Sequence, residues 1–263
     1  MAFLAVPGPF DFALSTERFR VFGVDRATVW HEGGLHRVVD GREVRIEPAP
    51  GGVDVSPAAD VTRLLGFPFD LDGFYAWAQG DEVLRHAAVR LRGFRPPLMP
   101  DPWEMLVGSI TAQQVSLFSA TAIRNRFVGR YGTQHEVAWE FPKREAVARA
   151  NDGDLVALGF SRRKEEYVLA LARGDFDLDA LAGLPDDEVK ARVVAQRGLG
   201  EWTAEWFLAR HLARPHAWPW GDLALRKAVT DLYRGLDVRE ARERFHPFEN
   251  LSAHYLLLAQ RVP

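Results

Sequence analysis

Two glycines, Gly198 and Gly200, separate two helical segments and constrain the fold more than any other feature of the sequence. The first segment begins at Pro185, a residue that suits the first helical position, and runs to about Gln196. Both glycines tolerate left-handed backbone angles, so the chain is expected to turn sharply before a second helix begins at Glu201. Backbone N–H groups in such a turn can hold a phosphate without a lysine side chain.

Asp222 follows an aromatic loop containing Trp218, Pro219 and Trp220, and it opens a third helix. An aspartate in this position is most often an N-cap that accepts backbone N–H groups. The helix dipole keeps such a carboxylate ionised, and an ionised carboxylate can stabilise a cationic transition state. From the residues alone, a capping role and a catalytic role are both open.

The second helical segment carries Trp202 and Trp206 one turn apart, with Ala209 and Ala213 on the same face. In a generic helix, aromatic side chains at this spacing are core residues. An indole face can also bind a cation, with an attraction of roughly 0.5–2 kcal/mol.

The segment Val194–Ala204 resembles the helix-hairpin-helix of the helix-hairpin-helix/GPD DNA glycosylases, and Pro219–Ala228 resembles their catalytic-aspartate segment. The spacing also fits, since Asp222 lies 24 residues after Gly198. The chain is most similar to the AlkA-type 3-methyladenine DNA glycosylase II branch. The resemblance implies an enzyme that flips a damaged base out of double-stranded DNA and hydrolyses its N-glycosidic bond, with Asp222 as the catalytic carboxylate.

The resemblance also assigns roles to the indoles. Family members that cut the DNA strand have a lysine at the position of Trp202, and this lysine forms a Schiff base with the sugar. Tryptophan has no amine, so the resemblance implies a monofunctional enzyme that uses water and leaves the strand intact. It places Trp202 and Trp206 in a base pocket, with Trp218 as a further wall, and favours cationic alkylated purines as substrates.

Contacts with DNA are implied at two places, the helix junction and the hairpin, through Gln113, Gln114, Gly198, Leu199, Gly200 and Thr203. Gln114 takes the position of the side chain that fills the gap left by the flipped base, although a polar pair that closes a helix is the simpler interpretation. Backbone carbonyls of Val194, Gln196 and Leu199 are expected to bind Na⁺ or K⁺. No other cofactor and no metal site built from side chains is expected.

The amino-acid composition excludes some kinds of protein. A chain of 263 residues without cysteine has no disulfide and no cysteine-ligated iron–sulfur cluster, which some glycosylases of this superfamily carry. The net charge of −3 provides no general attraction to DNA, so a local basic face is required. We expect a monomeric cytoplasmic protein without a signal peptide or membrane span.

The predicted fold is mainly α, with an all-helical glycosylase body in residues 96–263 and a small α+β domain in residues 1–95. Short β-branched segments separated by Gly33-Gly34 and Asp40-Gly41 predict an antiparallel sheet. Its strands are expected at 27–31, 35–39, 43–47 and 53–55, followed by helices near 57–65, 72–79 and 82–92.

The last helix departs from the AlkA pattern. The run Pro247–Ser252 replaces an aromatic-arginine-serine-aromatic run, and Leu257-Leu258 replaces a tryptophan-tyrosine pair. A less aromatic pocket leaves open a glycosylase for deaminated or oxidised bases. A second alternative is a non-catalytic helix-hairpin-helix module that binds DNA and uses Asp222 only as a cap.

Overall fold

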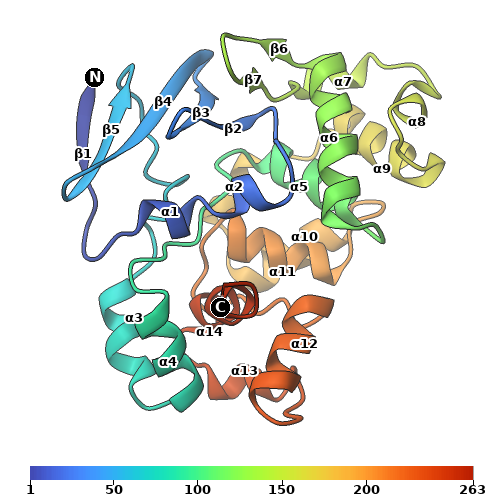
Figure 1. Cartoon of the computed structure of the whole chain (residues 1–263). Coiled ribbons are helices and arrows are strands. Elements are labelled where there is room, and N and C mark those ends of the chain that lie inside the picture. Colours follow the sequence, from blue (N-terminus) through green and yellow to red (C-terminus); the bar gives the residue numbers. More distant parts are fainter. Residues whose placement is uncertain (263) are drawn as a thin grey trace.

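The structure is a computed structural model that describes residues 1–262. A five-stranded antiparallel sheet lies in its N-terminal part (Figure 1). Its strands adjoin in the order β1-β5-β4-β3-β2. They are β1 (Ala2–Ala5), β2 (Thr28–His31), β3 (Gly34–Val39), β4 (Arg42–Ala49) and β5 (Gly52–Ser56). The four predicted strands are confirmed. β1 was not predicted; it pairs with a strand distant in sequence, with Leu4 opposite Val53.

The helix predicted near 57–65 is wrong, because this segment forms successive turns. The Asp60 carboxylate accepts the N–H of Thr62 at 2.9 Å, a local bond that competes with helix formation. Val61, Leu64 and Leu65 nevertheless pack into the core of the sheet, so the apolar spacing reflected burial and not a helix.

The rest of the described chain is helical apart from the short pair β6 (Thr133–Gln134) and β7 (Trp139–Glu140). The helices before the hairpin are α1 (Phe12–Ser15), α2 (Arg18–Val21), α3 (Leu71–Ala78), α4 (Glu82–Arg90), α5 (Pro102–Ala112), α6 (Leu117–Tyr131), α7 (Arg144–Ala148), α8 (Asp154–Ala157), α9 (Arg162–Arg173) and the 3₁₀ helix η1 (Asp179–Gly183). They are followed by α10 (Asp186–Val194), α11 (Glu201–Arg210), α12 (Leu223–Leu232), α13 (Ala241–Arg244) and α14 (Glu249–Ala259). No helix within residues 1–262 is long and apolar enough to cross a membrane.

Several helix ends follow the sequence closely. The hydroxyls of Ser116 and Ser161 accept N–H groups at the starts of α6 and α9, and Gly132 ends α6. Asp101 caps α5 by accepting the N–H of Glu104 at 3.0 Å. These caps fix the directions of the helices that surround the hairpin.

Three hydrophobic cores organise the molecule. The sheet has one core, and α5, α6, α9, α10 and α11 enclose a second. The third unites α3 and α4 with α12 and α14, so these early helices lie beside the C-terminal ones in Figure 1. The boundary at residue 95 stays a prediction. The packing shows that residues 71–98 share a core with residues 218–258.

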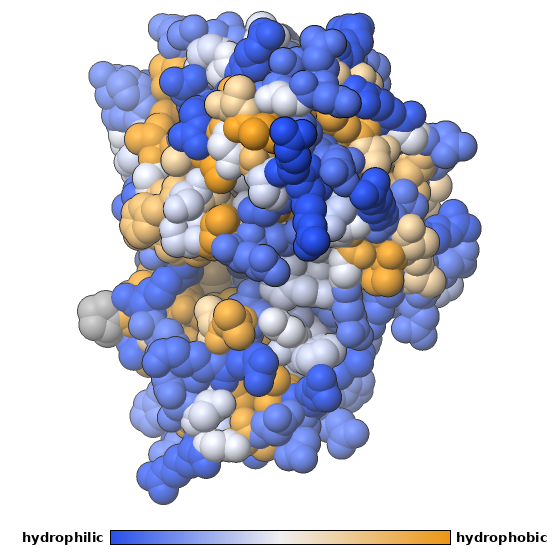
Figure 2. Space-filling model, turned by 90° about the vertical axis from the view of Figure 1, so that its right-hand side faces the viewer, coloured by the Kyte–Doolittle hydropathy of each residue, from blue (hydrophilic) through white to orange (hydrophobic). Residues whose placement is uncertain are grey.

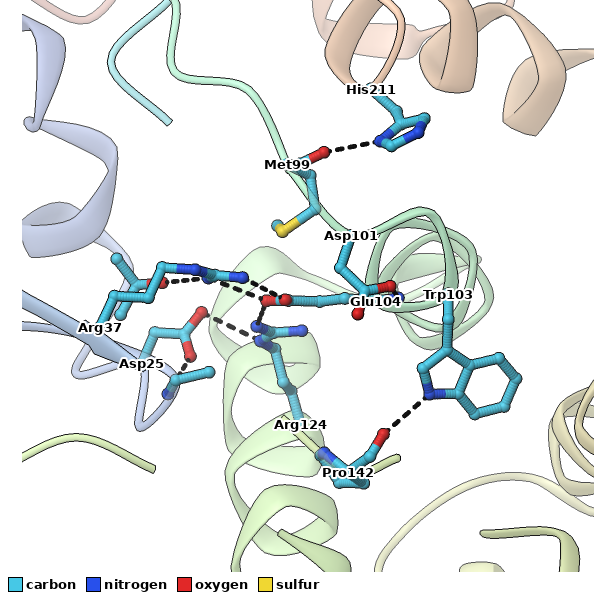
Figure 3. Close-up of polar contacts among 11 residues, drawn as sticks. Asp25, Arg37, Met99, Asp101, Trp103, Glu104, Arg124, Pro142 and His211 are labelled. Atoms are coloured by element: carbon cyan, nitrogen blue, oxygen red, sulfur yellow. Dashed lines mark hydrogen bonds and ion pairs between the residues drawn. The ribbon is translucent and has the colours of Figure 1, made fainter. Parts of the chain in front are cut away.

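A buried ion network joins the sheet to the helical body (Figure 3). Glu104 on α5 is fully buried, and its carboxylate pairs with Arg37 of β3 at 2.5 Å and with Arg124 of α6. Asp25 binds the same Arg124 at 2.9 Å. Burial by itself raises the pKa of Glu104, but the two guanidinium groups lower it from 4.5 to about 2.

This shifted pKa predicts acid sensitivity. Because the pKa of folded Glu104 lies below its unfolded value, its contribution to stability is complete above about pH 4.5. It is lost as the pH falls toward 2, and the shift corresponds to ~3 kcal/mol in the free energy of unfolding. Urea unfolding of wild type and Glu104→Gln between pH 6 and pH 2 checks this. The difference in unfolding free energy is expected to shrink across that window, and a constant difference would contradict it.

Candidate active site

The hairpin connects α10 to α11, and its two glycines have different conformations. Gly198 has a φ of +84°, and a Cβ atom there would lie 2.1 Å from the Tyr167 ring. Gly200 is the N-cap of α11 with a φ of −110°, and a Cβ would meet nothing within 4 Å. The predicted turn is therefore present, and only Gly198 uses a left-handed angle to make it.

This difference gives a matched pair of variants. Gly198→Ala is expected to lower the free energy of unfolding by at least about 2 kcal/mol, because it combines a left-handed backbone with a steric overlap. Gly200→Ala, with a permitted φ and open space, is expected to cost less than about 1 kcal/mol. Urea denaturation measures both, and equal effects would contradict the account.

Asp222 lies where the aromatic loop enters α12, and its carboxylate faces the hairpin helix α11. Its Oδ1 accepts the N–H groups of Ala224 at 2.9 Å and Leu225 at 3.1 Å. Its Oδ2 accepts the indole N–H groups of Trp202 at 3.2 Å and Trp206 at 3.1 Å. The carboxylate is both a helix cap and part of an indole cluster, and the residue is half-buried.

Four N–H donors occupy the two oxygens of Asp222 and stabilise its negative charge, as does the N-terminus of α12. A carboxylate offers about four lone-pair positions, so these donors fill them. Such a group is suited to act by its charge on a nearby cation. To take a proton from water it must first release one of its donors.

Arg210 and His254 both contact the indole of Trp206. The guanidinium carbon of Arg210 lies 4.0 Å from the centre of the Trp206 ring. The His254 imidazole, on α14, meets the same indole edge-to-face at 5.7 Å. Its Nδ1 donates to the carbonyl of Asn250 at 2.9 Å, which leaves Nε2 as an acceptor without a partner in the described chain.

Burial sets the charges of these groups. It lowers the pKa of Arg210 well below the usual 12.5; Arg18 lowers it further, and Asp222 opposes the shift. Arginine nevertheless keeps its charge at neutral pH. Burial, followed by Arg210, lowers the pKa of His254 to about 3, so this imidazole is neutral. The carboxylate of Asp222 therefore lies on one side of Trp206 with the cation of Arg210 against its ring, and Arg18 and Arg261 are close enough to act on Arg210.

The loop that carries Asp222 is fixed to the hairpin through Glu205. This buried α11 residue accepts the backbone N–H of Trp218 at 3.0 Å and pairs with Lys190 of α10 at 2.8 Å. Trp218 itself is 1% exposed, and its indole donates to the carbonyl of Val238 at 2.7 Å. Trp218 is therefore a core residue that anchors the loop, and its place in a base pocket stays a prediction.

Some of the predicted DNA-contact residues have buried side chains, and others offer polar groups at the hairpin. Thr203 is 1% exposed, so a side-chain contact between Thr203 and DNA is wrong. The side chain of Leu199 is also buried. Gln113 donates to the carbonyl of Gly198 at 2.9 Å and so connects the α5–α6 junction to the hairpin. The N–H groups of Gly198 and Gly200 donate no backbone bond within residues 1–262 and remain available to an anion.

Gln114 is exposed and has a φ of +55°, a strained angle for a residue with a side chain. The residues that follow it include exposed apolar side chains, Val115, Leu117 and Phe118. Figure 2 shows one side of the molecule hollowed between an upper and a lower part, with hydrophobic patches among hydrophilic residues. A strained, exposed junction with apolar neighbours is suited to enter a base stack.

Arg210, His254 and Glu205 were not predicted from the sequence. Arg210 lies one turn after Trp206 on the same helix, so the helical spacing that identified the tryptophans could have found it. Glu205 also lies in α11, but its partner Trp218 is in another segment. His254 meets Trp206 only through the packing of α14, for which the sequence gives no local signal.

The chain is similar to several known proteins. A family model for the HhH-GPD superfamily base excision DNA repair proteins matches residues 107–250. A DNA-3-methyladenine glycosylase of Bacillus subtilis is 31% identical over 65% of this chain and 60% of its own length. The chain thus spans about three-fifths of that relative.

Two solved structures are similar along nearly the whole chain. The 3-methyladenine DNA-glycosylase of Archaeoglobus fulgidus has a TM-score of 0.90 at 28% identity and covers 99% of both chains. The Clostridium acetobutylicum 8-oxoguanine glycosylase/lyase, in complex with double-stranded DNA, has a TM-score of 0.82 at 16% identity over 99% of this chain and 98% of that one. The second likeness concerns the fold alone.

Proposed function

Because this chain belongs to the HhH-GPD superfamily of base excision DNA repair proteins, we propose that it is a monofunctional DNA glycosylase. It hydrolyses the N-glycosidic bond of alkylated purines of the 3-methyladenine type in double-stranded DNA and leaves an abasic site. The names of the B. subtilis and A. fulgidus relatives support this substrate class. The DNA complex of the C. acetobutylicum protein, which shares the fold, supports a DNA partner.

The observation that carries the proposal is the contact of the Asp222 carboxylate with both indoles of the hairpin helix. This contact places one negative charge beside the half-buried indole of Trp202 and the buried indole of Trp206, on the helix that follows the phosphate-binding turn. As the glycosidic bond breaks, positive charge develops on the sugar, and a fixed carboxylate stabilises it. Since four donors already occupy Asp222, its charge is the main contribution, and water attacks the sugar cation afterwards.

The hairpin and the helix junction would hold the DNA. The free N–H groups of Gly198 and Gly200 bind a phosphate, and Gln114 enters the duplex where the damaged base leaves it. The backbone carbonyls of Val194 and Leu199 accept no backbone bond within the described chain and could bind the expected Na⁺ or K⁺, whereas the third expected carbonyl, that of Gln196, accepts the N–H of Leu199 at 3.1 Å. That ion would neutralise phosphate charge and take no part in the reaction.

Arg210 supports a second candidate, the release of deaminated or oxidised bases. Its cation occupies a face of Trp206 and disfavours a second cation such as an alkylated purine. Deaminated and oxidised bases are neutral and carry carbonyl oxygens that a guanidinium can bind. The two candidates share Asp222 and differ only in the base that the pocket accepts.

Base release from duplexes with one alkylated, deaminated or oxidised base tests the proposal. The alkylated duplex is expected to react fastest. Arg210→Gln separates the candidates. Removing this cation is expected to raise the release of alkylated bases relative to that of neutral bases, compared with wild type. Arg85→Gln is the control, because Arg85 is exposed on α4. Release from none of the duplexes, with DNA binding retained, would mean that the chain is only a DNA-binding module.

A monomeric state and a cytoplasmic location stay predictions.

A further inference from the structure

Two histidines and a buried glutamate meet on the outer side of the loop that leads to Asp222. The Nδ1 of His216 lies 3.1 Å from Glu249 Oε2, and the Nδ1 of His246 lies 3.3 Å from Glu249 Oε1. The two imidazole rings are stacked with centres 5.0 Å apart and planes 17° apart. One ligand atom from each residue lies within 4.8 Å of the others.

Glu249 is the unusual member of this cluster. Its side chain is 4% exposed, whereas those of His216 and His246 are 43% and 65% exposed. Within the described residues, only these two imidazoles bond to its carboxylate. Burying a carboxylate is costly unless a cation or several donors compensate for lost water. The buried charge points outward, between two nitrogen ligands that solvent can reach.

We propose that His216, His246 and Glu249 bind one Zn²⁺ ion. Zinc binds histidine nitrogen and carboxylate oxygen at about 2.0–2.2 Å, and tetrahedral geometry then places ligand atoms about 3.3 Å apart. The two nitrogen–oxygen distances of 3.1 and 3.3 Å are close to that value, and each runs to a different oxygen of Glu249. One ligand atom from each residue lies within 4.8 Å of the others, so both exposed rings must rotate to bring their nitrogens to one ion with one Glu249 oxygen, and water completes the coordination. Nitrogen and carboxylate ligands favour zinc over magnesium or calcium.

The ion would connect the catalytic loop to α14. His216 lies six residues before Asp222, and Glu249 begins α14. Hydrogen bonds already join this loop to α14, because Asn250 donates its backbone N–H to the carbonyl of Pro215 at 2.9 Å and its side-chain NH₂ to the carbonyl of Arg214 at 2.9 Å. A zinc ion at this junction stabilises the fold and takes no part in breaking the glycosidic bond. It goes beyond the proposed function and does not depend on it.

The test uses the full chain without a polyhistidine tag, freed of metal and then dialysed against buffered Zn²⁺. We expect one zinc per chain by elemental analysis, and a melting temperature that rises with free zinc. His246→Ala removes an exposed ligand and is expected to weaken zinc binding at least about tenfold, because one of three protein ligands is lost. His86→Ala, an exposed histidine on α4, is expected to bind as wild type does.

Glu249→Gln distinguishes a built site from a histidine pair that binds metal loosely. It keeps the shape and one oxygen but removes the charge, so zinc binding should fall as it does in His246→Ala. If Glu249→Gln does not fold, His216→Ala takes its place in the comparison. The proposal is overturned if wild type binds no zinc, or if His246→Ala binds as tightly as wild type. Base release is not a readout here, so failure of this proposal leaves the glycosylase proposal unaffected.

Discussion

Asp222→Asn is expected to slow base release by roughly 10²–10³-fold while duplex binding stays close to that of wild type. Asparagine can still cap α12, because its oxygen accepts the N–H groups of Ala224 and Leu225. Its NH₂ group, however, would face the indole N–H groups of Trp202 and Trp206, and donors do not pair with donors. The charge beside the sugar is lost, and the cap is kept.

Single-turnover release of the base and a separate measurement of DNA affinity distinguish chemistry from binding. Asp70→Asn is the matched control, because Asp70 caps α3 through the N–H of Gly73 and is exposed. It makes the same chemical change at a helix start outside the site. Equal base release in wild type and Asp222→Asn would show that Asp222 is only a cap.

The largest expected effect on stability is that of Glu104→Ala. Removing this carboxylate leaves Arg37 and Arg124 in a buried interface without their shared partner. Breaking a buried ion pair in this way costs about 3–5 kcal/mol in the free energy of unfolding. We expect the packing of the sheet against the helical body to weaken, because the network joins β3 to α5 and α6.

Urea denaturation at pH 7 measures this loss. Glu145→Ala is the control, since Glu145 also lies in the first turn of a helix, α7, and is exposed. It is expected to change the free energy of unfolding by less than about 0.5 kcal/mol. A loss below about 1 kcal/mol for Glu104→Ala would mean that the two arginines find water or other partners when the carboxylate is gone.

The features predicted best were those with a local cause. Turn residues such as Asp40 and Gly41 lie where the predicted hairpins of the sheet turn. The fold class and the hairpin followed from helical spacing and two glycines. At the site, Asp222, Trp202 and Trp206 lie together as expected, because the two tryptophans share a helix and the aspartate follows them closely in sequence.

What was missed depends on contacts between distant segments. Trp218 was placed in the base pocket because it is an aromatic residue close to Asp222 in sequence. Its burial against Phe245 and its hydrogen bond to the carbonyl of Val238 are set by tertiary packing. Thr203 lies beside Trp202 in sequence and yet faces the core. Arg37 and Arg124 look like surface cations until the sheet and the helical body bring them to Glu104.

The central claim is that the site around Asp222 breaks a glycosidic bond by hydrolysis and has no amine to attack the sugar. It is tested most directly by incubating the wild-type chain with a duplex carrying one 3-methyladenine, in the presence and absence of borohydride. We expect free 3-methyladenine, an equal amount of abasic sites, intact strands and no covalent protein–DNA product. A trapped product, or bound DNA without free base, would contradict it.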